Sequence, residues 1–141
     1  MSLVAQLNAA LQRRLEANLI VATEVRRNIQ TSPRGGKTYI KTNPNRTHTA
    51  SAPNESPATD LGFLVRSIQI EPDLQNLRVR ILSLHSIAPY AKRLEYGDLS
   101  RGLQPRPFMF KGLQAKKQVA IAIVQNAVNQ AIRDMQGVPP I

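Results

Sequence analysis

The stretch that decides the fold is residues 3–30, LVAQLNAALQRRLEANLIVATEVRRNIQ. Within it, one set of positions recurs at spacings of three and four residues and is almost entirely apolar, which is typical of one face of an amphipathic helix. That set is Val4, Leu7, Leu11, Leu15, Asn18, Ala22, Val25 and Ile29. Ser2 is a suitable N-cap, and the Pro- and Gly-containing residues 31–36 end the predicted helix.

The predicted helix is longer than a single small domain needs. At about 1.5 Å per residue it spans roughly 40 Å, although the whole chain has only 141 residues. We therefore expect part of the helix to pack against another subunit. Apolar positions off the main stripe are the candidates for that second contact: Leu3, Leu19, Ile20 and Val21.

Residues 31–60 differ from the helix in composition. They are rich in Thr, Asn, Ser, Pro and Gly, with few large apolar side chains besides Tyr39 and Ile40. A segment of this kind exceeds the about 12–15 residues of most compact loops. We expect an extended arm that neighbouring chains hold in place. Its basic residues are Arg34, Lys37, Lys41 and Arg46.

Strand patterns occupy the middle of the chain. Polar and apolar residues alternate over 67–71 and again over 77–85, with turn residues between the two runs. This pattern predicts an antiparallel hairpin with one buried face and one partly solvated face. The predicted buried face carries Leu77, Val79 and Ile81.

A second long helix follows the hairpin. Pro89 opens a short helix that ends near Gly97, and a turn-rich stretch then covers residues 98–107. The long helix runs from there to Gln136, and Gly137 ends it. Its apolar stripe comprises Phe110, Leu113, Ile121, Val124, Val128, Ile132 and Met135, with Lys117 as the one polar position in phase.

The order of these elements predicts a single α+β domain over residues 1–141. In it, two long helices pack on a small antiparallel sheet, and a long extended arm follows the first helix.

The chain contains no cysteine, which excludes disulfides and thiolate metal sites. Its longest apolar run, residues 119–124, is far short of the about 20 residues that cross a bilayer. No secretory signal is recognisable at the N-terminus. We expect a soluble cytosolic protein with no membrane contact.

The net charge of +10 is high for this length. The excess is concentrated between residues 81 and 117, where seven Lys and Arg residues face two acidic ones. Such a balance indicates a polyanionic neighbour, either nucleic acid or an acidic protein surface. The six Phe and Tyr residues offer no stacking platform for single strands. The charges are also spread out, which favours a solvated or protein-facing surface over a dedicated nucleic-acid site.

No arrangement of residues predicts catalysis. His48 and His85 each lack a second ligand at metal-binding spacing. The stretch from Arg34 to Thr38, RGGKT, lacks the strand-to-helix context of a phosphate-binding loop. The carboxylates are scattered singly and most lie beside Arg or Lys. We therefore expect no catalytic, cofactor-binding or metal-binding residues, and no enzyme.

Two segments resemble a known family. The first is HTASAPNESPATDLGFLVRSI, residues 48–68; the second is YAKRLEYG, residues 90–97, followed by PRPFM, residues 105–109. In this order, around a hairpin and between two helices, they resemble the tailed-phage neck and tail-component family typified by gene product ten of phage HK-ninety-seven. The chain departs from that family's usual residues at Asn54, Ser56, Leu61 and Asp98.

The resemblance implies a structural virion protein that joins head to tail in the neck or upper tail, around the DNA channel. It implies a homo-oligomeric ring, with a hexamer favoured. The implied partners are neighbouring neck proteins (connector or stopper), the tail terminator or tail tube, and genomic DNA through non-specific contact. The basic residues of the arm are then candidates for contact with DNA or with a neighbouring ring, and a solvated loop is an equal alternative: Arg34, Lys37, Lys41 and Arg46. The alternative from another class is a basic nucleic-acid-binding accessory protein, and a nuclease or other enzyme ranks third.

The second segment supplies the candidate subunit or partner interface. The candidates are Tyr90, Arg93, Glu95, Tyr96, Gly97, Arg106 and Phe108. Other roles compete with this one. For Glu95 a helix cap, or a pair with Arg93 or Arg106, is favoured over an intersubunit salt bridge. For Tyr90 and Tyr96, packing in the core or at a hinge is favoured over ligand contact, and Phe108 is expected to anchor the last helix in the core.

Overall fold

The computed structural model describes residues 2–73, 75–76 and 78–137, and its fold is α+β, as predicted. Two long helices, two short helices and two antiparallel two-stranded sheets make up the described chain. In chain order the elements are α1 (Leu3–Gln30), β1 (Thr38–Lys41), β2 (Arg46–Thr49), α2 (Phe63–Ser67), β3 (Ile68–Asp73), β4 (Arg78–Ser83), α3 (Ala91–Tyr96), the 3-10 turn η1 (Leu99–Arg101) and α4 (Met109–Met135).

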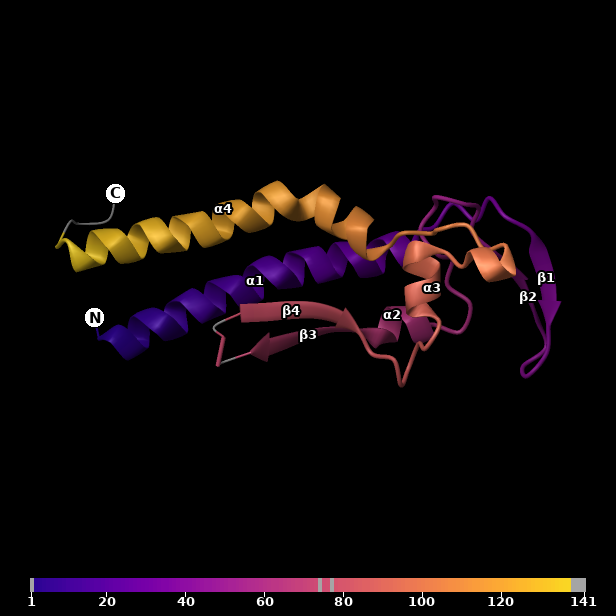
Figure 1. The fold of residues 1–141 in the computed structure, drawn as a ribbon, viewed down its shortest axis with the longest axis horizontal. Helices are drawn as coiled ribbons and strands as arrows, with labels where there is room; N and C mark the ends of the chain where they lie inside the picture. Colours follow the sequence, from indigo (N-terminus) through magenta and orange to yellow (C-terminus); the bar gives the residue numbers. More distant parts are fainter. Residues whose placement is uncertain (1, 74, 77, 138–141) are drawn as a thin grey trace.

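The long helices α1 and α4 lie side by side and antiparallel, and they form the axis of the molecule (Figure 1). The predicted bounds of α1 are confirmed. The Ser2 hydroxyl accepts a hydrogen bond from the backbone N–H of Ala5 (3.2 Å) and so caps the helix. α4 ends near Gly137, whose φ of 70° lies in the left-handed region that glycine tolerates.

The hairpin β3–β4 lies against the second half of α1 and supplies the third layer of the fold (Figure 1). Its register pairs Ile70 with Ile81, and both side chains pack on the core. Leu77, the first residue of the predicted buried face, lies outside the described residues. Sequence patterning missed α2, which takes Ser67 from the predicted strand.

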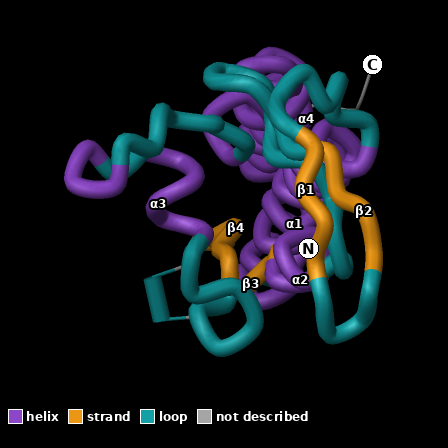
Figure 2. The backbone as a smooth tube through the Cα atoms, turned by 90° about the vertical axis from the view of Figure 1, so that its right-hand side faces the viewer, coloured by secondary structure: helices purple, strands orange, loops and turns teal. Residues whose placement is uncertain are grey.

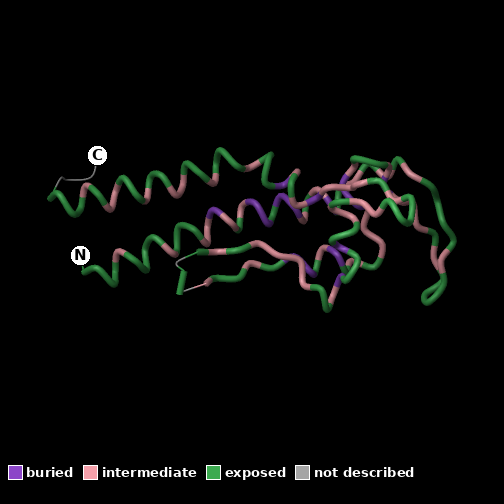
Figure 3. The backbone as a smooth tube through the Cα atoms, in the orientation of Figure 1, coloured by how far each residue is buried: buried purple, intermediate pink, exposed green. Residues whose placement is uncertain are grey.

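The buried core occupies one end of the molecule only. Val25, Ile29, Ile68 and Phe108 are at most 1% exposed, whereas the first half of α1 and most of α4 are open to solvent (Figure 3). The second contact predicted for α1 needs a correction at Val21. This side chain is 5% exposed and belongs to the core, because that side of α1 faces the intramolecular packing.

The apolar stripe predicted for the last helix does not face the core. Phe110 is 58% exposed, and Ile121, Val128 and Ile132 are each 45–49% exposed. α4 instead comes close to α1 at the buried Gly112, which lies against Val25. The helix is amphipathic as predicted, but its apolar side is mostly uncovered.

Residues 31–60 are more structured than the predicted arm. β1 and β2 form a hairpin with Tyr39 opposite His48 and Lys41 opposite Arg46, separate from the β3–β4 hairpin (Figure 2). The segment was expected to depend on neighbouring chains, yet side chains of its own chain hold it. Among the described residues, no helix combines the length and the apolar character needed to cross a membrane.

Candidate functional site

The Glu95 carboxylate caps the N-terminus of α4 from the end of the neighbouring helix α3. Its Oε2 accepts hydrogen bonds from the backbone N–H groups of Phe108 (2.8 Å) and Met109 (3.0 Å), and its Oε1 accepts one from Phe110 (3.0 Å). The first N–H groups of a helix have no partner within the helix, and a negative charge is favourable at this end. The cap interpretation of Glu95 is therefore confirmed, and the carboxylate is committed within its own chain.

Phe108 lies directly beside this cap. Its side chain is 1% exposed and packs in the same core as Ile29 and Ile68. The prediction that it anchors the last helix is confirmed. The prediction that it also belongs to a subunit interface is wrong, because a side chain this deeply buried cannot touch a partner.

Gly97 lets the chain turn sharply between α3 and α4. Its φ is 77°, and a Cβ there would lie 2.9 Å from the Leu103 carbonyl oxygen and 3.0 Å from the Pro105 nitrogen. The turn is closed by two backbone hydrogen bonds of 2.9 Å between Asp98 and Leu103. Only glycine meets both requirements, the left-handed φ and the close approach.

The second motif segment then meets the first. The Arg106 Nε donates to the Ser51 carbonyl oxygen (3.2 Å), and the Asn54 N–H donates to the Pro105 carbonyl oxygen (3.0 Å). The Lys111 ammonium group also donates to the Asn54 carbonyl oxygen. Segments 48–68 and 90–109, separated by the β3–β4 hairpin in the sequence, are thus joined in space. We call this contact the motif joint, comprising Ser51, Asn54, Glu95, Gly97, Pro105, Arg106 and Phe108.

Glu55 ties the start of the arm to the same loop. Its Oε2 accepts hydrogen bonds from the backbone N–H groups of Ala52 (2.8 Å) and Gly35 (2.9 Å). These two N–H groups hold the pKa of the Glu55 carboxyl below its ordinary value. The chain leaving α1 is therefore fixed against the first motif segment.

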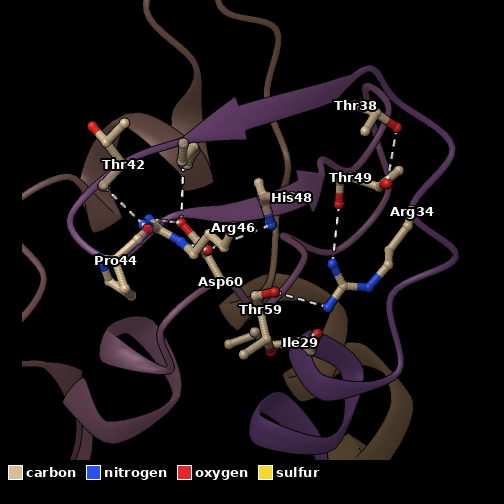
Figure 4. A network of polar contacts seen from close by, with 11 residues as sticks. Ile29, Arg34, Thr38, Thr42, Pro44, Arg46, His48, Thr49, Thr59 and Asp60 are labelled. Atoms are coloured by element: carbon tan, nitrogen blue, oxygen red, sulfur yellow. Dashed lines mark hydrogen bonds and ion pairs between the residues drawn. The ribbon is translucent and has the colours of Figure 1, made fainter.

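Asp60 fixes the β1–β2 hairpin to the body of the molecule (Figure 4). Its carboxylate accepts two hydrogen bonds from the Arg46 guanidinium, at 2.6 and 2.7 Å, and one from the Lys41 ammonium group at 3.0 Å. The Arg46 hydrogen bonds are the main reason why the pKa of Asp60 lies far below its ordinary value, and burial opposes them. The His48 ring lies 3.9 Å from the same carboxylate, and burial lowers its pKa.

The basic residues of the arm are used differently from what was predicted. The Arg34 guanidinium donates to the carbonyl oxygens of Thr49 (3.1 Å) and Thr59 (2.8 Å), so it binds the hairpin to the loop that follows it (Figure 4). Lys41 and Arg46 bind Asp60, whereas Lys37 is exposed. Three of the four residues predicted to face DNA or a neighbouring ring thus have partners within the chain, because acceptors distant in sequence lie beside them.

A cavity of about 510 Å³ separates the hairpin from the body. Its walls include Tyr39, Asp60, Phe63 and Tyr90. Of the cations on its wall, Lys41 and Arg46 bind the Asp60 carboxylate, and Arg106 donates to the carbonyl oxygens of Ser51 and Gln104. No group of three or more His, Cys, Asp or Glu side chains in the described part of the chain could hold a metal ion.

The other predicted interface residues lie at the surface. Tyr90 is 38% exposed, and burial is the first cause of its raised pKa. Arg93 is exposed, and Tyr96 is 74% exposed. Tyr96 lines a cavity together with Phe110 and Leu113 of α4. These three predicted residues remain available to a partner, in contrast to Phe108.

Sequence reasoning missed two organising residues, Asp60 and Gly112. Asp60 lies within the first motif segment, but its cationic partners are 14 and 19 residues away along the chain. Gly112 interrupts the apolar pattern of the last helix, and an interior helix glycine often marks a close backbone approach, so a signal was present. No protein-family model, curated protein or solved structure matches the chain.

Proposed function

We propose that this chain is a non-catalytic structural protein of a tailed-phage virion, a subunit of an oligomeric ring in the neck or upper tail. The ring would join head to tail around the DNA channel after assembly in the host cytoplasm. The proposal starts from the resemblance of segments 48–68 and 90–109 to the neck and tail-component family. Its partners would be neighbouring neck proteins, namely a connector or stopper, and the tail terminator or tail tube.

The motif joint is the observation that carries this proposal. The segments that carry the resemblance touch each other, and their polar groups bind backbone. Glu95 accepts three N–H groups, and the Arg106 guanidinium donates to the carbonyl oxygens of Ser51 and Gln104. The Glu95 carboxylate and the Arg106 guanidinium thus fix the position of a helix and a loop. A subunit of an assembly needs a fixed shape of this kind. A catalytic carboxylate would instead need to reach a substrate.

The incomplete core supports a role within an assembly. One end of the α1–α4 pair is covered by a third layer, whereas the other end leaves apolar side chains such as Leu7, Val128 and Met135 exposed. Large exposed apolar surfaces mark interaction sites. A sixfold ring would be the favoured closed form, in which each copy contacts two neighbours through different surfaces.

The alternative function is a basic nucleic-acid-binding accessory protein. The net charge of +10 favours it, and Lys92, Arg93 and Lys117 are exposed. In a ring, the same residues would contact the phosphates of the passing DNA without reading sequence. The two functions differ in what the isolated chain does. A dedicated binder holds duplex DNA tightly as a monomer, with affinity that falls steeply between 50 and 200 mM salt by about 10³-fold or more.

The deciding experiment uses a tailed phage that carries this gene. We expect peptide mass spectrometry to find the chain in purified virions, and a nonsense mutation in the gene to leave filled heads and separate tails. Complementation with the wild-type gene or with Glu71→Gln should restore joined particles, whereas Glu95→Gln should restore fewer. Normal virions without the chain would refute the proposal, and tight salt-dependent DNA binding by the monomer would favour the alternative.

A further inference from the structure

The outward face of α4 carries an apolar stripe that only Lys117 interrupts. We call it the α4 stripe: Phe110, Leu113, Ile121, Val124, Val128, Ile132 and Met135. Six of these seven side chains are 45–74% exposed, and Val124 is half-buried. The stripe runs along nearly the whole helix, whose length is about 40 Å at about 1.5 Å per residue.

The stripe is not the surface that holds α4 to α1. At the covered end, Gly112 lies so close to α1 that a Cβ there would be 3.1 Å from the Val25 backbone. At the other end, the groove between the helices is lined by alanines, including Ala10 of α1 and Ala127 of α4, together with larger side chains that are mostly polar. With about 100° between successive residues, the stripe lies about a third of a turn away from this small-residue side. Packing within the chain therefore leaves it free.

The first turns of α1 add a second uncovered stripe. Val4, Leu7 and Leu11 stand 18 residues, or about five turns, before Ala22, Val25 and Ile29, so they share one helix face. The later three are 0% exposed, whereas Val4 is 67% and Leu7 is 41% exposed. The β3–β4 hairpin covers this face only over the second half of α1 (Figures 1 and 3).

The two stripes open on the same side of the molecule. Phe110 and Leu113 line one cavity together with Val25 of α1 and Ile81 of β4. The α4 stripe therefore faces the side on which the hairpin lies, and Val4, Leu7 and Leu11 continue the α1 face that the hairpin covers. We call the two stripes together the bare surface.

We propose that the bare surface binds the same surface region of a second copy of this chain. The area of the bare surface is suitable for a second copy. With a helix width of about 10 Å, the α4 stripe covers roughly 400 Å² and the uncovered stripe of the first turns of α1 covers roughly 200 Å². Two copies together bury about 1,200 Å², the lower end of stable specific interfaces. The occupant must present a matching apolar surface about 40 Å long, and a second copy presents one.

Charge also favours a second copy over other occupants. The chain carries a net charge of +10, yet Lys117 is the one charged position in phase with the α4 stripe. Nucleic acid and anionic membranes bind through Lys and Arg side chains, which the bare surface largely lacks. Copies that meet here keep most of their positive charges apart. Two copies that meet through the same surface form a closed pair with twofold symmetry, and this contact is separate from the contacts between different surfaces that close the proposed ring. The proposal can therefore fail without affecting the chain's place in a virion.

The test compares two double variants that add the same charge to α4. Ile121→Glu/Val128→Glu places two carboxylates in the α4 stripe, and Gln118→Glu/Asn129→Glu places two on the exposed side of the helix away from it. We expect light scattering after size exclusion to give the wild type and the Gln118/Asn129 variant a mass of two or more copies. The Ile121/Val128 variant should give a single copy of 15.6 kDa with unchanged helical circular dichroism.

A label provides a second measurement that does not depend on the stability of a charged variant. The chain has no cysteine, so Val128→Cys or Gln118→Cys carries a single environment-sensitive fluorophore. The label at position 128 should lose most of its accessibility to a soluble quencher as protein concentration rises, and the label at position 118 should not. A wild type that stays monomeric, or an Ile121/Val128 variant that still assembles, overturns the proposal. Binding of the monomer to lipid vesicles through position 128 also overturns it.

Discussion

The two halves of α1 carry the same apolar pattern in different surroundings. Ala22, Val25 and Ile29 are 0% exposed beneath the β3–β4 hairpin and beside α4. Val4 and Leu7, five turns earlier on the same face, are 67% and 41% exposed. The amphipathic pattern of α1 therefore specifies which face is covered, while the length of the covering layer decides how much of that face is buried. The uncovered first part of this face belongs to the bare surface, which we propose binds a second copy of the chain.

The largest effect should come from the core of the covered half. Ile29→Ala removes a fully buried side chain and should lower the free energy of unfolding by about 2–5 kcal/mol. Leu11→Ala, at the equivalent position five turns earlier, should cost less than about 1 kcal/mol in the monomer because Leu11 is only half-buried. Urea denaturation of dilute protein measures both. Equal losses of unfolding free energy in the two variants would mean that the two halves of α1 do not differ in burial.

A matched pair on α4 tests the same contrast from the other helix. Gly112→Val forces a branched side chain against the Val25 backbone and should cost about 1–3 kcal/mol of unfolding free energy. Gln130→Val, also five turns away but at the open end, should change it by no more than about 0.5 kcal/mol. Thermal unfolding followed by circular dichroism separates the two. A neutral Gly112→Val would show that α4 does not approach α1 this closely.

The caps of α4 and α1 differ in the same way, because Glu95 caps α4 at the covered end of the molecule and Ser2 caps α1 at the open end. In the wild type, the two carboxylate oxygens of Glu95 accept three backbone hydrogen bonds. Glu95→Gln keeps one carbonyl oxygen as an acceptor and replaces the other oxygen with an NH2 group, which faces the N–H donors and cannot accept from them. It should lower the unfolding free energy by about 1–2 kcal/mol. Ser2→Ala, at the open end, should only fray the first turn and cost about 0.5 kcal/mol. Hydrogen exchange of the first amides of α1 and α4 reports each cap, and unchanged exchange at residues 108–110 would contradict the Glu95 cap.

The smallest effect should come from the arm, which polar contacts fix to the body. Asp60→Asn should cost about 1 kcal/mol or less at neutral pH, because the ion pairs with Lys41 and Arg46 are partly exposed. The pKa of Asp60 is depressed in the folded protein, so its contribution is complete above the ordinary value of about 3.9 and is lost as the pH falls toward the folded value. The stability difference between wild type and variant, measured by urea denaturation, should narrow from pH 5 to pH 2. A difference that does not vary with pH would rule out this role.

Much of the local structure could be predicted from the sequence. The bounds of α1, the Ser2 cap, the β3–β4 hairpin and a short helix before Gly97 all follow from periodicity, capping and turn chemistry over a few residues. The sequence also predicts the core position of Phe108, and for Glu95 it favours a helix cap, or an ion pair with Arg93 or Arg106, over an intersubunit salt bridge. The β1–β2 hairpin was missed because its strands are only four residues each in a polar, turn-rich segment.

The candidate site is formed by contacts between residues distant in sequence, which local sequence patterns do not predict. Arg106 and Ser51, joined by a hydrogen bond, are 55 residues apart, and Asp60 and Arg46 are 14 apart. The basic residues of the arm therefore looked free in the sequence, although three of the four are bound within the fold. Their partners could not be assigned, because a charged side chain in a polar segment has many potential partners and no periodicity selects one.

The sequence by itself determined the α+β class, two long amphipathic helices and the apolar face of each. These features depend on the 3.6-residue and two-residue periods and on caps, all of which act within one or two turns of chain. Only the tertiary structure decided which faces are covered. α4 uses Gly112 and its alanines against α1, because small residues let two backbones approach closely, and this choice turns the larger apolar stripe outward. That orientation depends on how whole surfaces fit together and leads to the proposed contact between copies.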